Sequence, residues 1–188
     1  MSTLRDSHTN KPGSGPNAEK PVEDFILQAI EAENLAHDIY VQFSQMFFHI
    51  PGVSRFWQDL AYDEAKHAYT LKKTRQTLTT EQRSIPADPK LLCRLTNTIA
   101  LLKRVSLDAV RTLDGAYEIA HELEFSELNY IFKCVVNDFM TQEEGEQFVV
   151  RTIDEHQRKL VDFTDHFGDR HWRRHIQARS TTYVASEK

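Results

Sequence analysis

The sequence predicts an all-α protein, an antiparallel four-helix bundle with a long crossover that contains a short helix. Two observations support this fold class. Between Pro21 and Phe167, apolar residues recur at helical spacing, and no segment alternates apolar and polar residues as strands do. Most of the six glycines and six prolines lie in the first 21 residues or at breaks between the apolar segments. A helical bundle is the architecture that this pattern favours.

The first two expected helices form a hairpin. Helix one begins at Pro21, because proline suits a first helical position, and the break at residues 49–52 (His-Ile-Pro-Gly) ends it. Helix two is expected from about Val53 to Leu78, with Trp57 and Leu60 on its apolar face.

The second half begins with the crossover. Residues 79–90 hold two prolines and predict a connection, followed by a short helix over about 91–104. A third long helix is expected over about 107–137, with Ser106 as its cap and Gly115 marking a bend. A fourth is expected from near Gly145 to about Phe163.

The length of 188 residues suits one domain with a real core. The expected organisation is a disordered arm at 1–20, the bundle at 21–167, and a basic extension at 168–188. The extension could dock on a membrane surface, a second subunit or a protein shell, but a solvated tail is the simpler interpretation. A net charge of −5 gives no reason to expect nucleic-acid binding by the body.

The two cysteines exclude several classes of protein. Cys93 and Cys134 are too far apart in sequence for a C-x-x-C pair, and two cysteines cannot make a zinc ribbon or a disulfide scaffold. Buried free thiols in a reducing compartment are expected instead. No apolar run approaches the roughly 20 residues that span a bilayer, and no signal-peptide core precedes the first helix. The expected location is cytoplasmic.

Four glutamates carry the functional signal. Glu33 and Glu64 stand 31 positions apart, and Glu124 and Glu155 repeat that separation in the second half. Three of the four interrupt apolar stripes, where carboxylates repel one another and lose water at a cost. Bound cations would offset both effects, so the pattern predicts a metal site inside the bundle.

The motif Glu64-x-x-His67 strengthens this interpretation. A spacing of three residues places carboxylate and imidazole on the same side of one helical turn, where both can reach one ion. Imidazole with several carboxylates suits iron, manganese or zinc and disfavours copper.

These motifs resemble those of the rubrerythrin-type, ferritin-like di-iron carboxylate proteins. Glu33-x-x-Ala36-x-x-x-Tyr40 looks like the first helix of that family, and Glu64-x-x-His67 matches its second-helix motif. Glu124-x-x-Glu127 resembles the third helix, in which two glutamates three apart serve the metals. The resemblance covers about residues 21–163.

The resemblance implies a ferritin-like bundle with two non-haem irons, although manganese or zinc is possible. The chemistry implied is that of an oxidoreductase, a peroxidase or ferroxidase that reduces peroxide or dioxygen or oxidises ferrous iron. The metal ligands it implies are Glu33, Glu64, His67, Glu124, Glu127 and Glu155. Glu64 and Glu155 would be the bridges, and Tyr40 would lie beside the metals as a supporting group.

Two departures from the family pattern leave alternatives open. The fourth-helix motif ends in Arg158 where the family carries histidine, and arginine cannot bind a metal. An asymmetric site, a single-metal site or an inactive relative would each follow, with His121 or His156 as a less favoured substitute ligand. The chain also lacks paired C-x-x-C motifs, so a peroxidase would need an external electron donor.

Two other functions fit the same sequence. A ferritin-like subunit could store iron in a cage or as cargo of a larger compartment, in which case iron itself is the substrate. A metal-free bundle could serve as an interaction module, with Arg158 neutralising the buried carboxylates. A homodimer or a higher homo-oligomer is expected for the redox and storage functions.

Overall fold

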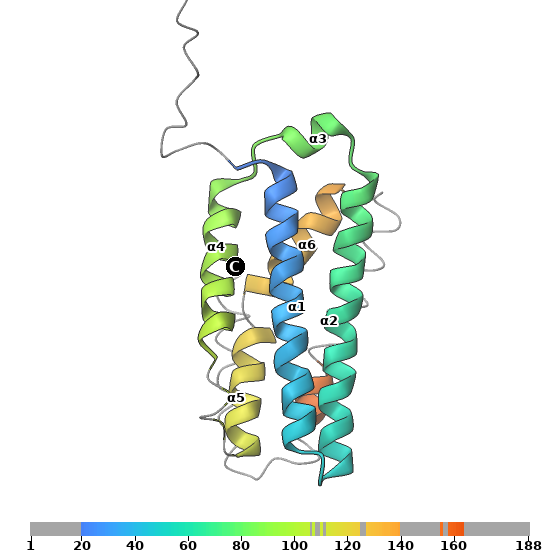
Figure 1. The fold of residues 1–188 in the computed structure, drawn as a ribbon, viewed down its shortest axis with the longest axis vertical. Helices are drawn as coiled ribbons and strands as arrows, with labels where there is room; N and C mark the ends of the chain where they lie inside the picture. The colour runs from blue at the N-terminus through green and yellow to red at the C-terminus, as the bar shows by residue number, and fades with distance from the viewer. Residues whose placement is uncertain are drawn as a thin grey trace, which may run out of the picture.

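The computed structural model describes residues 20–105, 107, 110, 112–124, 127–139, 155 and 158–163, and this part of the chain is all-α (Figure 1). Its helices are α1 Val22–Met46, α2 Pro51–Thr77, α3 Thr80–Ser84, α4 Pro89–Arg104, α5 Leu113–Glu124 and α6 Glu127–Phe139. Residues 158–163 are also helical. The only extended pairing among the described residues is an isolated bridge between Pro21 and Pro86. The all-α part of the predicted fold class is therefore confirmed for the described residues.

Helices α1 and α2 form a long hairpin and lie side by side (Figure 1). Pro21 precedes α1 in extended conformation. Two acidic residues in the first turn, Glu23 and Asp24, stabilise the helix by interacting with the positive end of its dipole. Pro51 opens α2, where its missing N–H costs no helical hydrogen bond. Both helices thus start close to their predicted positions.

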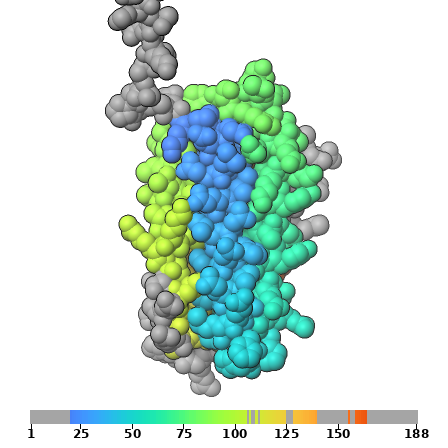
Figure 2. Space-filling model, viewed as in Figure 1, coloured from blue at the N-terminus to red at the C-terminus, as the bar shows by residue number. Residues whose placement is uncertain are grey.

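The crossover contains the predicted short helix, α4, and before it a second short helix, α3, that the sequence pattern did not indicate. Thr79 and Gln82 form a capping box: the Thr79 side chain accepts from the Gln82 N–H, and the Gln82 side chain accepts from the Thr79 N–H. Helix α4 follows, with the Asp88 side chain accepting from Lys90 N at 2.7 Å. Figure 2 shows α1 flanked by α2 on one side and by α4 on the other.

A clasp joins the crossover to the start of α1. Val22 N donates to the Ile85 carbonyl at 2.8 Å, and Ala87 N donates to the Lys20 carbonyl at 2.9 Å. Beside these bonds, Arg75 at the end of α2 donates from Nε to Glu23 Oε1 at 2.7 Å. The clasp fixes where α1 begins relative to the end of α2.

The expected third helix over 107–137 corresponds to α5 and α6, and α5 begins at Leu113. Residues 125–126, between these two helices, lie outside the described residues. Gly115 lies in the first turn of α5, where its N–H donates to Thr112 Oγ1 at 3.1 Å. The helical residues 158–163 agree with the end of the expected fourth helix. The rest of that helix, apart from Glu155, lies outside the described residues, as do Ser106, His156, the N-terminal arm up to residue 19 and the extension at 168–188.

The core runs between α1, α2, α4, α5, α6 and the 158–163 stretch. Near one end it is aromatic: Trp57 stacks with Tyr40, with ring centroids 6.0 Å apart, and Phe163 stacks on Phe56 at 3.9 Å. None of the described helices is long and apolar enough to cross a membrane.

The expectation of two buried thiols was wrong for Cys93. Both cysteines are free, but Cys93 is exposed and Cys134 is only half-buried. The buried side of α4 passes through Leu95, Ile99 and Leu102, which leaves Cys93 on another side of that helix.

Candidate metal centre

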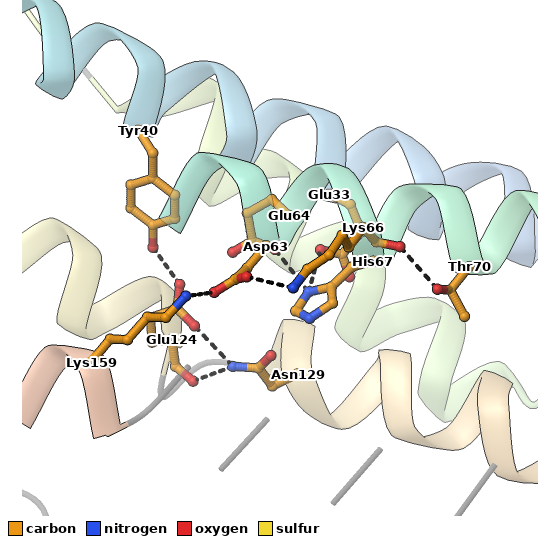
Figure 3. A network of polar contacts seen from close by, with 10 residues as sticks. All are labelled: Glu33, Tyr40, Asp63, Glu64, Lys66, His67, Thr70, Glu124, Asn129 and Lys159. Carbon is orange, nitrogen blue, oxygen red and sulfur yellow. Dashed lines mark hydrogen bonds and ion pairs between the residues drawn. The ribbon is translucent and has the colours of Figure 1, made fainter. Parts of the chain in front are cut away.

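Three predicted ligands meet between α1 and α2 in the middle of the hairpin (Figure 3). The exposed fractions are 1% for Glu33, 2% for Glu64 and 0% for His67. One ligand atom from each lies within 4.8 Å of the others. The hairpin produces this arrangement because Glu33 lies on the inner face of α1, while Glu64 and His67 share one turn of α2.

His67 is held between the two carboxylates. Its Nδ1 lies 3.0 Å from Glu64 Oε2 and 3.5 Å from Glu33 Oε2. Burial alone lowers the pKa of His67, but hydrogen bonding and the negative charge of Glu33 and Glu64 outweigh burial. The pKa of His67 is therefore raised well above its ordinary value, so the metal-free centre holds a proton there.

The donor set of this group fits a divalent cation. Two carboxylates and one imidazole converge in a buried position. Glu33 Oε2 is buried, and its contact with His67 Nδ1 at 3.5 Å is an ion pair longer than an ordinary hydrogen bond. Carboxylate oxygens and an imidazole nitrogen that already converge can bind iron, manganese or zinc when the proton leaves.

Glu124 faces the same interior from the end of α5, and both of its carboxylate oxygens accept hydrogen bonds. Tyr40 Oη donates to Oε1 at 2.5 Å, and Asn129 Nδ2 donates to Oε2 at 3.1 Å. The same Asn129 nitrogen lies 2.7 Å from the Glu124 carbonyl. Tyr40 and Asn129 thus stabilise a buried carboxylate without a metal.

Tyr40 lies near three buried glutamates, Glu33, Glu64 and Glu124. Burial and the charge of Glu124 raise its pKa well above the ordinary value, and Glu64 and Glu33 add to the effect. The phenol therefore stays protonated and acts as a hydrogen-bond donor. Its hydroxyl donates to Glu124 in the same interior that holds the three-residue group (Figure 3).

Asp63, next to Glu64 in sequence, connects α2 to the last helical stretch. Its side chain is buried, and it forms ion pairs with Lys66 at 3.0 Å and with Lys159 (Figure 3). This carboxylate is neutralised by lysines and lies outside the three-residue group.

The remaining predicted ligands have different positions. Glu127 is the first residue of α6, and its side chain lies outside the described part. Glu155 and Arg158 are helical residues with exposed side chains. His121, considered as a substitute ligand, lies with its ring centroid 6.2 Å from that of Tyr117. The roles of Glu127 and Glu155 as ligands stay predictions.

Sequence reasoning did not identify Asp63 as a buried acid. It also missed the partners of two buried acids: Lys159, which pairs with Asp63, and Asn129, which donates to Glu124. Asp63 and Lys159 gave a weak sequence signal: Asp63 directly precedes the predicted ligand Glu64, and Lys159 directly precedes the apolar residue Leu160. Asn129 gave none, because helical periodicity does not show which flank of α6 faces Glu124.

The chain matches no protein-family model, no curated protein and no solved structure, so its interpretation rests on its own sequence and geometry.

Proposed function

We propose that the protein is a non-haem iron oxidoreductase built on a ferritin-like four-helix bundle. One observation carries the proposal: two carboxylates and one imidazole, all buried, converge within 4.8 Å on two neighbouring helices. Buried carboxylates this close to each other are unfavourable unless protons or cations compensate for their charge. An iron ion held by Glu33, Glu64 and His67 would supply that charge and would exchange electrons with an oxidant.

Glu124 extends the centre toward a second metal position. It is buried, accepts a hydrogen bond from Tyr40, and is one of the six ligands that the family resemblance implies. Binding a second ion there would require Glu124 to exchange a hydrogen bond from Tyr40 or Asn129 for a metal bond. The proposed substrates are peroxide or dioxygen, or ferrous iron itself.

The test is metal content after anaerobic incubation with ferrous iron and removal of unbound metal. We expect at least one iron per chain in the wild type and almost none in Glu64→Gln/His67→Gln, which removes the carboxylate without changing its shape and removes the imidazole. The matched control is Asp59→Asn/His49→Gln, because both of these residues are exposed. Equal iron content in the two double variants would refute the assignment.

Oxidant consumption then separates an enzyme from a metal-binding protein. Ferrous-loaded wild type should consume added hydrogen peroxide faster than the same iron free in solution, and the control variant should behave as the wild type. Peroxide consumption no faster than with free iron would refute the oxidoreductase proposal while leaving metal binding intact.

A metal-free interaction module is the second candidate, and two contacts favour it. The His67 proton neutralises part of the acidic charge, and Tyr40 with Asn129 satisfies Glu124. This candidate predicts that chelators and added iron leave the free energy of unfolding unchanged, whereas a metal that binds only the folded state must raise it.

A further inference from the structure

The outward face of α2 carries a regular row of aromatic and cationic side chains, here called the tyrosine–lysine stripe: Tyr62, Lys66, Tyr69 and Lys73. The two tyrosines are 66% and 60% exposed. Lys66 Nζ lies 5.1 Å from the Tyr62 ring centroid, and Lys73 Nζ lies 5.6 Å from that of Tyr69. Cation–π contact holds each lysine along the helix surface.

The stripe is cationic although the chain as a whole is acidic. Between Tyr62 and Gln76 the exposed positions of α2 include Lys72 as well as the stripe, and none of them is a carboxylate. The two acids of this segment, Asp63 and Glu64, are both buried. This face of α2 therefore presents positive charge in a protein whose net charge is −5. Helix α4 also presents exposed cations, among them Lys90 and Arg104, but α2 is the helix that carries two of the candidate ligands.

The stripe and the candidate metal centre lie on opposite faces of the same helical turns. Glu64 and His67 face inward, while Tyr62 and Tyr69 face outward. A helix with its side chains is about 10–12 Å across, so roughly that distance separates a molecule on the stripe from the centre. α2 is the shortest connection between this surface and the buried ligands.

We propose that the tyrosine–lysine stripe is the docking surface for an acidic one-electron carrier protein that reduces the metal centre. The proposal rests on the redox function proposed above. Charge complementarity identifies the partner, since an acidic surface is attracted to Lys72 and Lys73, which lie on an α2 face without an exposed carboxylate between Tyr62 and Gln76. The tyrosines supply apolar contact area at low entropic cost, as interface residues commonly do.

The electron balance of the step is simple. Each docked carrier loses one electron, and that electron reduces one ferric ion of the centre to ferrous. The carrier then leaves, so a small and salt-sensitive interface suits the task. The chain itself carries no paired C-x-x-C motif that would hold an iron–sulfur donor.

The experiment uses a reduced, acidic [2Fe–2S] ferredoxin as the probe. Its oxidation by ferric-loaded protein is followed by stopped-flow absorbance at several salt concentrations. We expect the second-order rate constant for Lys72→Glu/Lys73→Glu to fall about tenfold at low salt and to lose most of its salt dependence. The matched control, Lys90→Glu/Arg104→Glu, makes the same charge change at two exposed positions of α4 and should stay within about twofold of wild type.

A second variant tests the aromatic part of the stripe. Tyr62→Ala/Tyr69→Ala should weaken ferredoxin binding to the ferric-loaded protein, measured by fluorescence anisotropy, with no change in its iron content. A rate constant and a binding affinity that match the α4 control for both stripe variants would overturn the proposal.

Other occupants of the stripe are distinguished in the same series. If the lysine reversal changes the oligomeric state in light scattering, or if an RNA oligonucleotide displaces the ferredoxin probe at equal charge concentration, the surface serves another partner and the proposal is wrong. Failure of the proposed function has a separate signature, because wild-type protein would then hold no iron. Probe binding to the metal-free protein would still report on the surface.

Discussion

The hydroxyl of Tyr40 on α1 donates a 2.5 Å hydrogen bond to Glu124 at the end of α5. Both side chains are buried, and they come from the two halves of the sequence. This bond connects the α1–α2 hairpin to the second half of the chain at the level of the candidate metal centre. Its loss should therefore affect both stability and metal binding.

Tyr40→Phe should destabilise the metal-free protein by about 1–3 kcal/mol, because one oxygen of a buried carboxylate loses its donor. Urea unfolding monitored by circular dichroism measures the change. Tyr62→Phe is the control, since the Tyr62 side chain is mostly exposed. If a second metal binds Glu124, the iron-loaded protein should lose less stability than the metal-free protein does.

The ion pair between Lys159 and Asp63 should fix the last helical stretch against α2. Lys159→Met should destabilise the protein by about 1–2 kcal/mol, because buried Asp63 keeps Lys66 as its remaining lysine partner. Adding Asp63→Asn removes the buried charge that has lost one of its two lysine partners. The double variant should therefore be more stable than the sum of the two single changes predicts. Additive effects in this cycle would show that the pair contributes no coupling.

The pKa of His67 predicts how the stability of the metal-free protein depends on pH. Because the folded-state pKa is raised above the unfolded value of about 6.5, the contribution of the protonated ring is fully present below that pH. It is lost as pH rises through the folded-state pKa. Urea unfolding in the presence of a chelator should show a decline in stability over that alkaline window.

His67→Gln should remove that decline, while His49→Gln, at an exposed position, should keep it. Identical pH profiles for the two variants would show that His67 does not hold the proton.

Iron should replace the proton as the stabilising charge. At a free ferrous concentration about 100-fold above the dissociation constant, the folded state gains about 2.7 kcal/mol, provided the unfolded chain does not bind. For a chain of this size, each kcal/mol raises the unfolding midpoint by roughly 2–4 °C. Anaerobic thermal scans should show that rise in wild type and none in Glu64→Gln/His67→Gln.

Single glutamate variants separate the first metal position from the second. Glu33→Gln should abolish iron loading, because it removes one member of the three-residue group. Glu155→Gln should leave at least one iron per chain, because Glu155 has an exposed side chain and the group stays intact. Complete loss of iron in Glu155→Gln would mean that this residue is required at the first position.

Much of the hairpin was predictable because local signals agreed there. Apolar spacing, proline at the start of each helix and the break after Phe48 all indicate the same two helices, and the structure begins α2 only two residues before the predicted Val53. The short helix α3 was missed because it has no buried residue, and its signal was the Thr79 capping box alone. The start of the third helix was predicted near residue 107, six residues before α5 begins at Leu113.

The same reasoning explains which parts of the site were predictable. Glu33, Glu64 and His67 each interrupt a strong apolar stripe, so their burial followed from helical geometry. Asn129 and Lys159 depend on how separate helices are rotated against one another. That rotation is set by tertiary packing, which spacing along one helix does not determine.

All three members of the buried acid–imidazole group belong to one stretch of chain, from Glu33 to His67, that folds back on itself through a single tight turn. Contacts within such a unit have low sequence separation, and segments of this kind assemble rapidly. During synthesis the hairpin leaves the ribosome before α5 and α6 exist. A nascent chain can therefore bring Glu33, Glu64 and His67 together first, and α5 and α6 then pack over a group that has already formed.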